Sequence, residues 1–413
     1  MYRVTYTALA CLLLGSLSAQ AEVPPPLGFE RVQVDELNTL QKVWLDDDLL
    51  AEGWIQLTGS KELFGWTSTN GTPWNVCSGA DAFLFDEGEY WLMSNTEWGD
   101  FELIVDFSIR GKNCNSGVFI RSADVPTDPT KDCYEINIAP PTNGYPTGSL
   151  VGRQRGEYSE GQLKTLDKLY ATHRLHIIAE GGHIQAKLDG KVVTDYTDPN
   201  PIPKGRIGLQ HKEGNVLFKR VLLKPLGEKS IFNGKDLTGW KTDLAGPAKI
   251  SVTDAGEMQI LGGSGQVESE GEYGDFVMQF ECKVNGDGAN SGVFFRSIPG
   301  DKMNGYECQI QNSYLDGDRT KPKDCGTGGI YRRVNARLVN AKDHEWFYVT
   351  LNANGPHYAV WVNGIQVTDW TDTREPDENP RRGLRLKPGT FCLQAHDPTT
   401  DLLFRNLRVA ELP

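Results

Sequence analysis

The sequence contains one eight-residue pattern twice, as NSGVFIRS at residues 115–122 and as NSGVFFRS at 290–297, an offset of 290 − 115 = 175 residues. Other segments repeat in the same order. WGDFELIVDF (98–107) matches YGDFVMQFEC (273–282), CYEINI (133–138) matches GYECQI (305–310), and LDGKVVTDY (188–196) matches VNGIQVTDW (362–370). A repeat of this length predicts two copies of one domain in the 413-residue chain.

The repeat also indicates where the domains begin and end. The last matching segment of the first copy runs into KPLGEK (224–229), and the second copy starts there. We therefore expect a signal peptide over residues 1–21, a first domain over 27–226 and a second domain over 227–413.

Each copy consists of short segments in which apolar and polar residues alternate. Clusters of turn-forming residues separate them, and the chain has 45 Gly and 22 Pro. This pattern predicts antiparallel strands stacked as two sheets, so we expect an all-β fold of two tandem β-sandwiches, with a helix only within 35–52. The expected core of the second domain comprises Phe276, Met278, Phe280, Val293, Phe295, Tyr306, Ile310, Phe347, Val349, Leu351, Tyr358, Val360, Val362, Phe391 and Leu393.

The N-terminus has the order of features found in secretory signals. Arg3 precedes an apolar run, and Ala19-Gln20-Ala21 predicts cleavage before Glu22, with a lipoprotein site at Cys11 as the alternative. The apolar run is too short for a membrane span, and no later apolar segment is long enough. We expect a periplasmic or secreted protein.

Charge and cysteine content exclude several classes of function. The formal net charge of −13 argues against nucleic acid as a partner, which requires clustered positive charge. Cys114 and Cys133 flank the first repeat motif and are candidates for a disulfide, with buried free thiols as the alternative. No Cys/His spacing indicates zinc, and no motif indicates a nucleotide or another organic cofactor. The oligomeric state is not indicated.

In both copies, the residues that alternate with the core form a polar face that includes aromatic side chains. Such a face suits a sugar, because rings stack on pyranose faces while amide and guanidinium groups bond to hydroxyl pairs. An ordinary cross-strand ion pair between Arg296 and Glu307 is the alternative. The substrate-binding candidates are Phe294, Gln309, Trp361 and Gln394 in the second copy and Arg121, Glu135 and Asn137 in the first.

The motifs FNGKDLTGW, NSGVFFRS, GYECQIQNSY, GTGGIYR and LQAH…LFRNLRVAEL, in this order, resemble the 3-keto-disaccharide hydrolase family. The resemblance covers nearly all of the second copy and, more weakly, the first. It implies a concanavalin A-like jelly-roll fold and cleavage of glycosides oxidised to a ketone at ring carbon 3. The ketone acidifies the proton on carbon 2, so a base removes it and the aglycone leaves carbon 1 by β-elimination; added water gives net hydrolysis.

The resemblance also implies roles for particular residues. Glu307 is implied as the base or a metal ligand, Arg296 as a group that stabilises the enolate or binds hydroxyl groups, and Gln309 as a residue that orients the sugar. His396 is implied as an acid or base, and Tyr331 as a proton donor to the leaving group. A divalent metal ion is implied for some members.

The chain departs from the family pattern in two places. The family's usual Asp after the YE-x-Q strand is Asn312 here, so a carboxylate is missing and Asn312 remains only a substrate-binding candidate. The first copy departs further, since its strand runs into Pro140-Pro141 and its TGSLVGR lacks a tyrosine equivalent to Tyr331. We predict an exported enzyme with its active site in the second domain; a non-catalytic tandem carbohydrate-binding protein is the alternative.

Overall fold

The computed structural model describes residues 44–59, 63–69, 74–76, 82–83, 89–111, 113–166 and 168–413. The expected signal peptide, its Cys11 and the first half of the expected helix at 35–52 lie outside the described residues. Of that helix, the structure shows one short piece, α1 (Asp47–Ala51), which begins after the N-cap Asp46. A second short helix, α2 (Glu160–Leu166), was not predicted.

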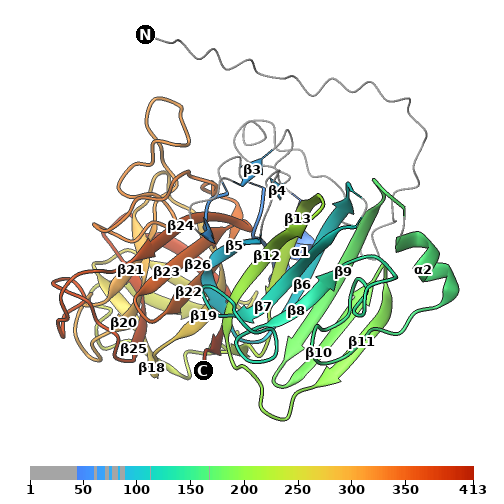
Figure 1. The fold of residues 1–413 in the computed structure, drawn as a ribbon. Coiled ribbons are helices and arrows are strands. Elements are labelled where there is room, and N and C mark those ends of the chain that lie inside the picture. Colours follow the sequence, from blue (N-terminus) through green and yellow to red (C-terminus); the bar gives the residue numbers. More distant parts are fainter. Residues whose placement is uncertain are drawn as a thin grey trace, which may run out of the picture.

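The described residues form three β-sheets (Figure 1). A 16-stranded sheet runs through both domains, and each half of it packs against a separate five-stranded sheet. The predicted all-β fold with two tandem concanavalin A-like sandwiches is therefore confirmed. Within the described part of the chain, no helix has the length and hydropathy needed to cross a membrane.

The strands have the following bounds. In the first domain, the large sheet runs β11 (Lys191–Thr197), β10 (His183–Leu188), β9 (Thr172–Glu180), β6 (Phe101–Ile109), β13 (Val216–Pro225) and β1 (Ile55–Gln56). It continues in the second domain as β24 (Ile365–Thr371), β23 (His357–Val362), β22 (Trp346–Asn354), β19 (Phe276–Val284), β26 (Asp401–Glu411), β17 (Met258–Leu261) and β16 (Lys249–Val252). Off this path, β14 (Lys229–Ser230) pairs with β26, and β3 (Asn75–Val76) pairs with β4 (Ala82–Phe83), which pairs with β13.

The two five-stranded sheets have matching orders. The first is β2 (Trp66–Ser68), β5 (Tyr90–Trp98), β12 (Gly205–Glu213), β7 (Asn115–Ser122) and β8 (Tyr134–Ile138). The second is β15 (Trp240–Lys241), β18 (Gly265–Tyr273), β25 (Gly389–Ala395), β20 (Ser291–Ser297) and β21 (Tyr306–Ile310). The NSGVF motif of each copy therefore lies on the strand next to the sheet edge.

Each sandwich has its own apolar core. All fifteen residues predicted for the second core lie in one buried cluster between the large sheet and the second five-stranded sheet. Burial of about 25 cal/mol per Å² of apolar surface makes such a cluster the main favourable term in folding. The alternating pattern therefore identified the core correctly.

The two domains are joined by strand pairing and by apolar packing. β1 pairs antiparallel with β13 and parallel with β24, and so links the two halves of the large sheet. Trp98 of β5 packs on Trp361 of β23, with ring centroids 5.5 Å apart. Val277 and Ala359 of the second domain belong to the same cluster as the first domain's core.

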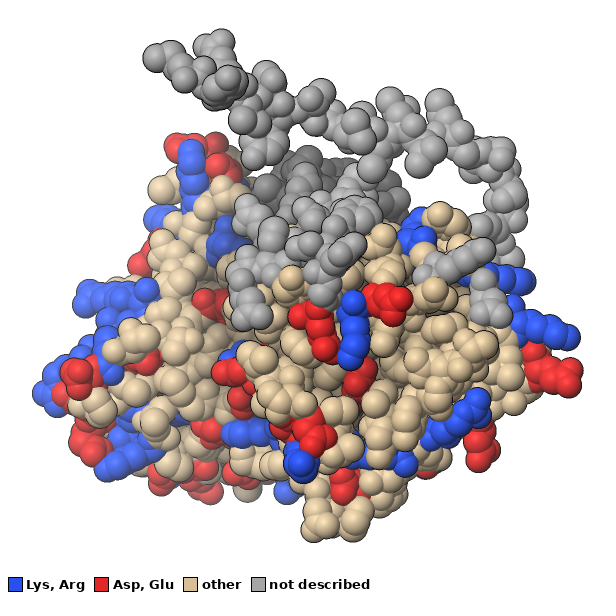
Figure 2. Space-filling model, in the orientation of Figure 1, with Lys and Arg blue, Asp and Glu red and all other residues tan. Residues whose placement is uncertain are grey.

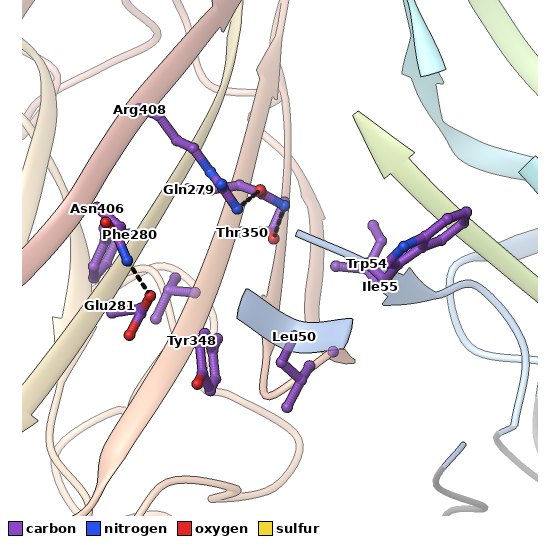
Figure 3. Close-up of a pocket in the computed structure, with 12 residues that line it drawn as sticks. Leu50, Trp54, Ile55, Gln279, Phe280, Glu281, Tyr348, Thr350, Asn406 and Arg408 are labelled. Carbon is purple, nitrogen blue, oxygen red and sulfur yellow. Dashed lines mark hydrogen bonds between the residues drawn. The ribbon is translucent and has the colours of Figure 1, made fainter. Parts of the chain in front are cut away.

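The segment around α1 packs on the back of the second domain (Figure 3). The Gly53 carbonyl accepts a hydrogen bond of 2.9 Å from Gln279 Nε2, and Arg408 donates to the other side of that amide at 2.7 Å. Trp361 Nε1 donates to the Gln56 carbonyl at 3.2 Å. The start of the first domain is thus also part of the second domain's surface.

This packing overturns one prediction. Trp361 was expected on a sugar-binding face, but it is 1% exposed and lies in the contact between the domains. The reason is that a sandwich has two outer faces, one per sheet, and alternation along a strand does not distinguish them. Trp361 lies on the outer face of the large sheet, whereas Phe294 and Gln394 lie on the five-stranded sheet.

Arg296 was also predicted to point outward, and it does not. It is 0% exposed and has a φ of 47°, at a β-bulge where the pairing of β20 with β25 shifts register. Arg121 in β7 has the same burial and a φ of 46°. A bulge breaks the two-residue period of a strand, so alternation fails at both arginines.

Each buried arginine bonds to the turns that surround it. Arg296 Nη2 lies 2.6 Å from Asp275 Oδ1, and its other nitrogens donate to the carbonyls of Gly274 and Gly355 at 3.0 and 2.7 Å. It also donates to the Tyr358 hydroxyl at 2.8 Å.

The first domain repeats this arrangement. Arg121 bonds to Asp100 at 2.6 Å and to the Gly99 and Gly181 carbonyls at 2.9 and 2.6 Å. Both arginines are therefore structural, and neither is available to a substrate.

The predicted disulfide is also absent. Cys114 and Cys133 are both buried free thiols, as are the other four cysteines among the described residues. Burial raises the pKa of the Cys114 thiol to about 12, so it is an unreactive core residue. Cys77 lies outside the described residues.

Replacing the buried arginine should destabilise the fold. Arg296→Met removes a donor from Asp275 and from several carbonyls, and removing one partner of a buried pair costs about 3–5 kcal/mol. We expect a clear fall in melting temperature by differential scanning calorimetry, and a similar fall for Arg121→Met.

The matched control is Arg382→Met, because the side chain of Arg382 is 69% exposed and should cost less than about 0.5 kcal/mol. If the melting temperature of Arg296→Met equals that of this control, the structural role assigned to Arg296 is wrong.

Candidate active site

The outer face of the second five-stranded sheet brings several predicted site residues together. In the pairing of β20 with β21, Gly292 lies opposite Gln309 and Phe294 lies opposite Glu307. On the other side of β20, Phe294 lies opposite Cys392, which places Gln394 beside Gly292. Phe294 belongs to the buried residues but not to the apolar core, as expected for the outer face.

Gly292 allows the Glu307 side chain to lie flat on the sheet. A Cβ at position 292 would be 2.8 Å from both Cγ and Oε1 of Glu307, closer than real Cβ contacts come. The backbone of Gly292 does not have a positive φ, so close approach alone requires glycine here. This explains the glycine of the NSGVF motif.

Glu307 is a buried carboxylic acid in a polar site. It is 6% exposed, and burial raises its pKa to about 7, an effect that the positive charges of Arg381 and His396 partly offset. Arg381 Nη2 lies 3.5 Å from Glu307 Oε2, and its guanidinium lies over the Phe294 ring, 5.4 Å from the centroid. A carboxyl group with a pKa near 7 exchanges its proton readily at neutral pH, which is what a general base requires.

Two amide oxygens beside Glu307 lack a hydrogen-bond donor. Gln309 Nε2 donates to Asn290 Oδ1 at 2.8 Å, and Asn290 in turn donates to Asp324 at 2.6 Å. Gln309 Oε1 and Gln394 Oε1, however, are buried and have no partner among the described residues. An unpaired buried acceptor costs about 1–3 kcal/mol, and the hydroxyl groups of a bound sugar would relieve that cost.

Two further candidates lie at the edge of this face. Tyr331 lines a pocket with Glu307 and Arg381, and its backbone N–H donates to the Glu307 carbonyl at 2.9 Å. The side chain of His396, just after β25, is 41% exposed, with its Nδ1 2.8 Å from Asp397 Oδ2. When Nδ1 carries the proton donated to Asp397, Nε2 is left to act toward a substrate.

Asn312 does not take part in this group. Its Nδ2 donates to Asp343 at 2.9 Å, and its Oδ1 accepts from Thr327 Oγ1 at 2.6 Å. Asn312 is 6% exposed, so both ends of the amide hold loops together. The structure thus gives it a supporting position rather than the substrate contact that the sequence suggested.

The first domain keeps a related face. Glu135 lies against Gly117, where a Cβ would be 3.1 Å from its Cγ, and burial raises the pKa of Glu135 to about 7. Asn137 Oδ1 and Gln210 Oε1 are buried without a donor among the described residues, as are the amide oxygens of the second domain. The backbone N–H that contacts the Glu135 carbonyl belongs to Val151, so a valine replaces Tyr331 here.

Sequence reasoning missed the arginines of this site. Arg381 comes from the link between β24 and β25, and Arg332 and Arg333 follow Tyr331. The run NPRRG (379–383) contains Arg381 and is not among the predicted site residues. The sequence feature that could have pointed to Arg381 is that the first copy has no equivalent of this run, since only residues 198–204 connect β11 to β12.

The residues around Glu307 do not suit the divalent metal ion that the family resemblance implies. Its pocket is lined by three guanidinium groups and one carboxylate. Within the described parts of the chain, no three His, Cys, Asp or Glu side chains are grouped as a metal would require. Hard cations need several oxygen ligands, and clustered arginines repel them.

The fold is a tandem β-sandwich, and sequence comparison shows that it is built from carbohydrate-active domains. The family model of the 3-keto-alpha-glucoside-1,2-lyase-like domain matches residues 53–224 and again residues 227–410. The chain therefore belongs to that family, in tandem duplicate, and the predicted resemblance is confirmed.

Solved structures similar to single domains of the chain were also found. A proposed glycosyl hydrolase from Parabacteroides distasonis is 20% identical, with a TM-score of 0.36, over 45% of this chain and 94% of its own. A second one from the same organism is 24% identical, with a TM-score of 0.34, over 42% and 99%. The carbohydrate-binding module CBM66 from Bacillus subtilis is 20% identical, with a TM-score of 0.31, over 39% and 95%. No curated protein matches the chain.

The raised pKa of Glu307 should depend on Gly292. In Gly292→Ala, the added Cβ displaces the carboxyl group toward solvent, and we expect the pKa of Glu307 to fall from about 7 toward its ordinary value of 4.5. The measurement is an NMR titration of ¹³C-labelled glutamate carboxyl groups, with the Glu307 signal assigned by its loss in Glu307→Gln.

Gly274→Ala is the matched control, because a Cβ there makes only an ordinary contact of 3.5 Å with Pro388. A Glu307 pKa that stays near 7 in Gly292→Ala would show that Gly292 does not position this carboxyl group.

Proposed function

We propose that the protein is an exported enzyme that cleaves 3-keto-glycosides at the outer face of its second domain. The observation that carries this proposal is Glu307, a buried carboxyl group with a pKa of about 7 beside unpaired amide oxygens. Family membership supports the same chemistry. The signal-like N-terminus supports export.

The first chemical step is removal of a proton by Glu307. Its carboxylate takes the proton from carbon 2 of the oxidised sugar, and the ketone at carbon 3 holds the resulting negative charge on oxygen as an enolate. Arg381, 3.5 Å from Glu307, is the cation placed to stabilise that oxygen. This is the role that the sequence had assigned to Arg296.

The second step breaks the glycosidic bond. The electron pair of the enolate forms the double bond between carbons 1 and 2 while the bond from carbon 1 to the aglycone oxygen breaks. His396 or Tyr331 supplies the proton that the leaving oxygen needs. When water then adds across the double bond, the net reaction is hydrolysis.

Substrate binding falls to the side chains around Glu307. Gln309 and Gln394 offer their free oxygens to sugar hydroxyl groups. Phe294, predicted as a substrate-binding residue, is fully buried under the Arg381 guanidinium and supports the site without contacting the sugar. In the first domain, Glu135 and Asn137 form a similar face without a tyrosine equivalent to Tyr331. We propose that this first face binds saccharide without cleaving it.

Product analysis tests the proposed reaction. The purified mature protein should cleave 3-keto-trehalose and leave trehalose intact, and Glu307→Gln should reduce the rate at least about 100-fold, because general base catalysis typically contributes 10²–10⁴-fold. The Asn312→Ala variant is the control for a nearby polar change with no chemical role. Binding of sugar without cleavage would favour the carbohydrate-binding alternative.

The rate should rise with pH through about 7. Only deprotonated Glu307 accepts a proton, and its pKa of about 7 makes the base mostly protonated at pH 5 and mostly ionised at pH 8. We expect kcat/KM for 3-keto-trehalose to increase roughly tenfold per pH unit below 6 and to level off above 8. A rate that is flat between pH 5 and 8 rules out Glu307 as the base, and the addition of EDTA should leave the profile unchanged.

A further inference from the structure

The pocket beside Glu307 is strongly basic, although the chain as a whole is acidic. The formal net charge of the protein is −13, yet Arg332, Arg333 and Arg381 line one pocket whose single carboxylate is Glu307. Lys and Arg side chains gather at this end of the second domain, on the left in Figure 2, where Figure 1 places β21 and β25.

Most arginines of the link between β24 and β25 are neutralised by a carboxylate of the same link. Arg374 lies 2.7 Å from Asp372, Arg382 lies 3.1 Å from Asp377, and Arg385 lies 3.3 Å from Glu378. These pairs fold the link onto the sheet edge. The basic character of the pocket therefore comes from its three lining arginines.

Two of the lining arginines have no carboxylate partner. Within the described residues, neither Arg332 nor Arg333 has an acidic side chain within ion-pair distance. Arg333 is half-buried, and its Nη2 donates to the Arg381 carbonyl at 2.7 Å, which holds it next to a second guanidinium group. Burial and the like charges of Arg374 and Arg381 lower the pKa of Arg333, an effect that the negative charge of Asp372 partly offsets. Arg332 is exposed and its guanidinium lies over the Tyr331 ring, 5.2 Å from the centroid, so both arginines have N–H donors that no carboxylate contacts.

The first domain lacks this feature. Gly152 and Arg153 stand in place of Arg332 and Arg333, and Arg153 lies over the Tyr134 ring and 3.8 Å from Asp198. The short link over residues 198–204 has no counterpart of Arg381. The unpaired arginines are therefore an addition to the second domain and not a requirement of the sandwich.

We propose that the arginines of this pocket bind an anionic group carried by the saccharide, so that the second domain prefers charged sugars over neutral ones. This inference rests on the proposed function, since it concerns the same site. The pocket offers about 70 Å³, enough for a carboxylate or phosphate group beside the ring held at Glu307. Guanidinium groups bind both kinds of anion through paired hydrogen bonds.

Binding measurements distinguish charged from neutral sugars. We expect isothermal titration calorimetry at 20 mM NaCl to give at least about tenfold tighter binding for glucuronic acid or glucose 6-phosphate than for glucose. One or two charge-assisted hydrogen bonds to the anionic group account for a difference of this size. Whichever of the two anions binds more tightly identifies the anionic group. The preference should weaken at 200 mM NaCl, because salt screens charges near the surface.

Variants assign the preference to these arginines. The double substitution R332Q/R333Q should remove the preference for charged sugars, while R333K should retain most of it. R382Q is the matched control, because Arg382 is exposed and paired with Asp377 on the same link. Melting temperatures of all variants check that each one folds.

Failure of this inference differs from failure of the proposed function. Equal binding of charged and neutral sugars, or a preference that persists in R332Q/R333Q, overturns the inference while cleavage of 3-keto-trehalose stays intact. If the wild-type protein does not cleave 3-keto-trehalose, the proposed reaction is wrong, but a preference for charged sugars measured by calorimetry would still support the inference. If no sugar binds at all, both are wrong.

Discussion

Both sandwiches depend on a buried arginine that bonds to an aspartate and to the carbonyls of surrounding turns. In the second domain, Arg296 connects the turn at Gly274 and Asp275 with the turn at Gly355, and so joins both sheets at one end. A desolvated guanidinium group is stable only when its donors are satisfied, so these turns must keep their positions. The repeated motifs WGD or YGD and NSGVF-x-R therefore reflect one structural requirement, met twice.

That rigid end determines what the outer face presents. The bulge at Arg296 shifts the pairing of β20 after Phe294, and the preceding residues remain in regular register with β21. Glu307 then lies across Gly292 and is shielded from water, which raises its pKa to about 7. Burial of a carboxyl group disfavours its charged form, so the fold sacrifices some stability at neutral pH for a reactive group. The same arrangement at Glu135 and Gly117 shows that it precedes the divergence of the copies.

The two copies differ mainly in what covers their outer faces. The second domain has a longer link before β25 of its five-stranded sheet, and this link brings Arg381 over Phe294 and beside Glu307. In the first domain the corresponding link is only residues 198–204, and Val151 occupies the position of Tyr331. The domains are also held together by β1 and by the contact of Trp98 with Trp361. The outer face of the large sheet therefore packs the two domains together, while the outer face of the second five-stranded sheet carries the candidate active site.

The sequence by itself determined the duplication, the all-β class, the core and the carboxylate at the centre of the site. Period-two alternation is a local property of a strand, so the core residues and the outer position of Phe294, Glu307 and Gln309 could be predicted. Alternation failed at Arg296, where a bulge reversed the side chain, and at Trp361, which faces outward on the other sheet.

Only the tertiary structure decided which polar residues meet. Arg381 and Glu307 are 74 positions apart in the sequence and come together because a long link folds back over the sheet edge. Asn312 is of a residue type that often binds sugars, but both ends of its amide are hydrogen-bonded, to Asp343 and to Thr327 in other loops. Which polar side chains come into contact depends on the paths of the loops and on competition for hydrogen bonds across the whole domain. A local sequence pattern contains no information about either.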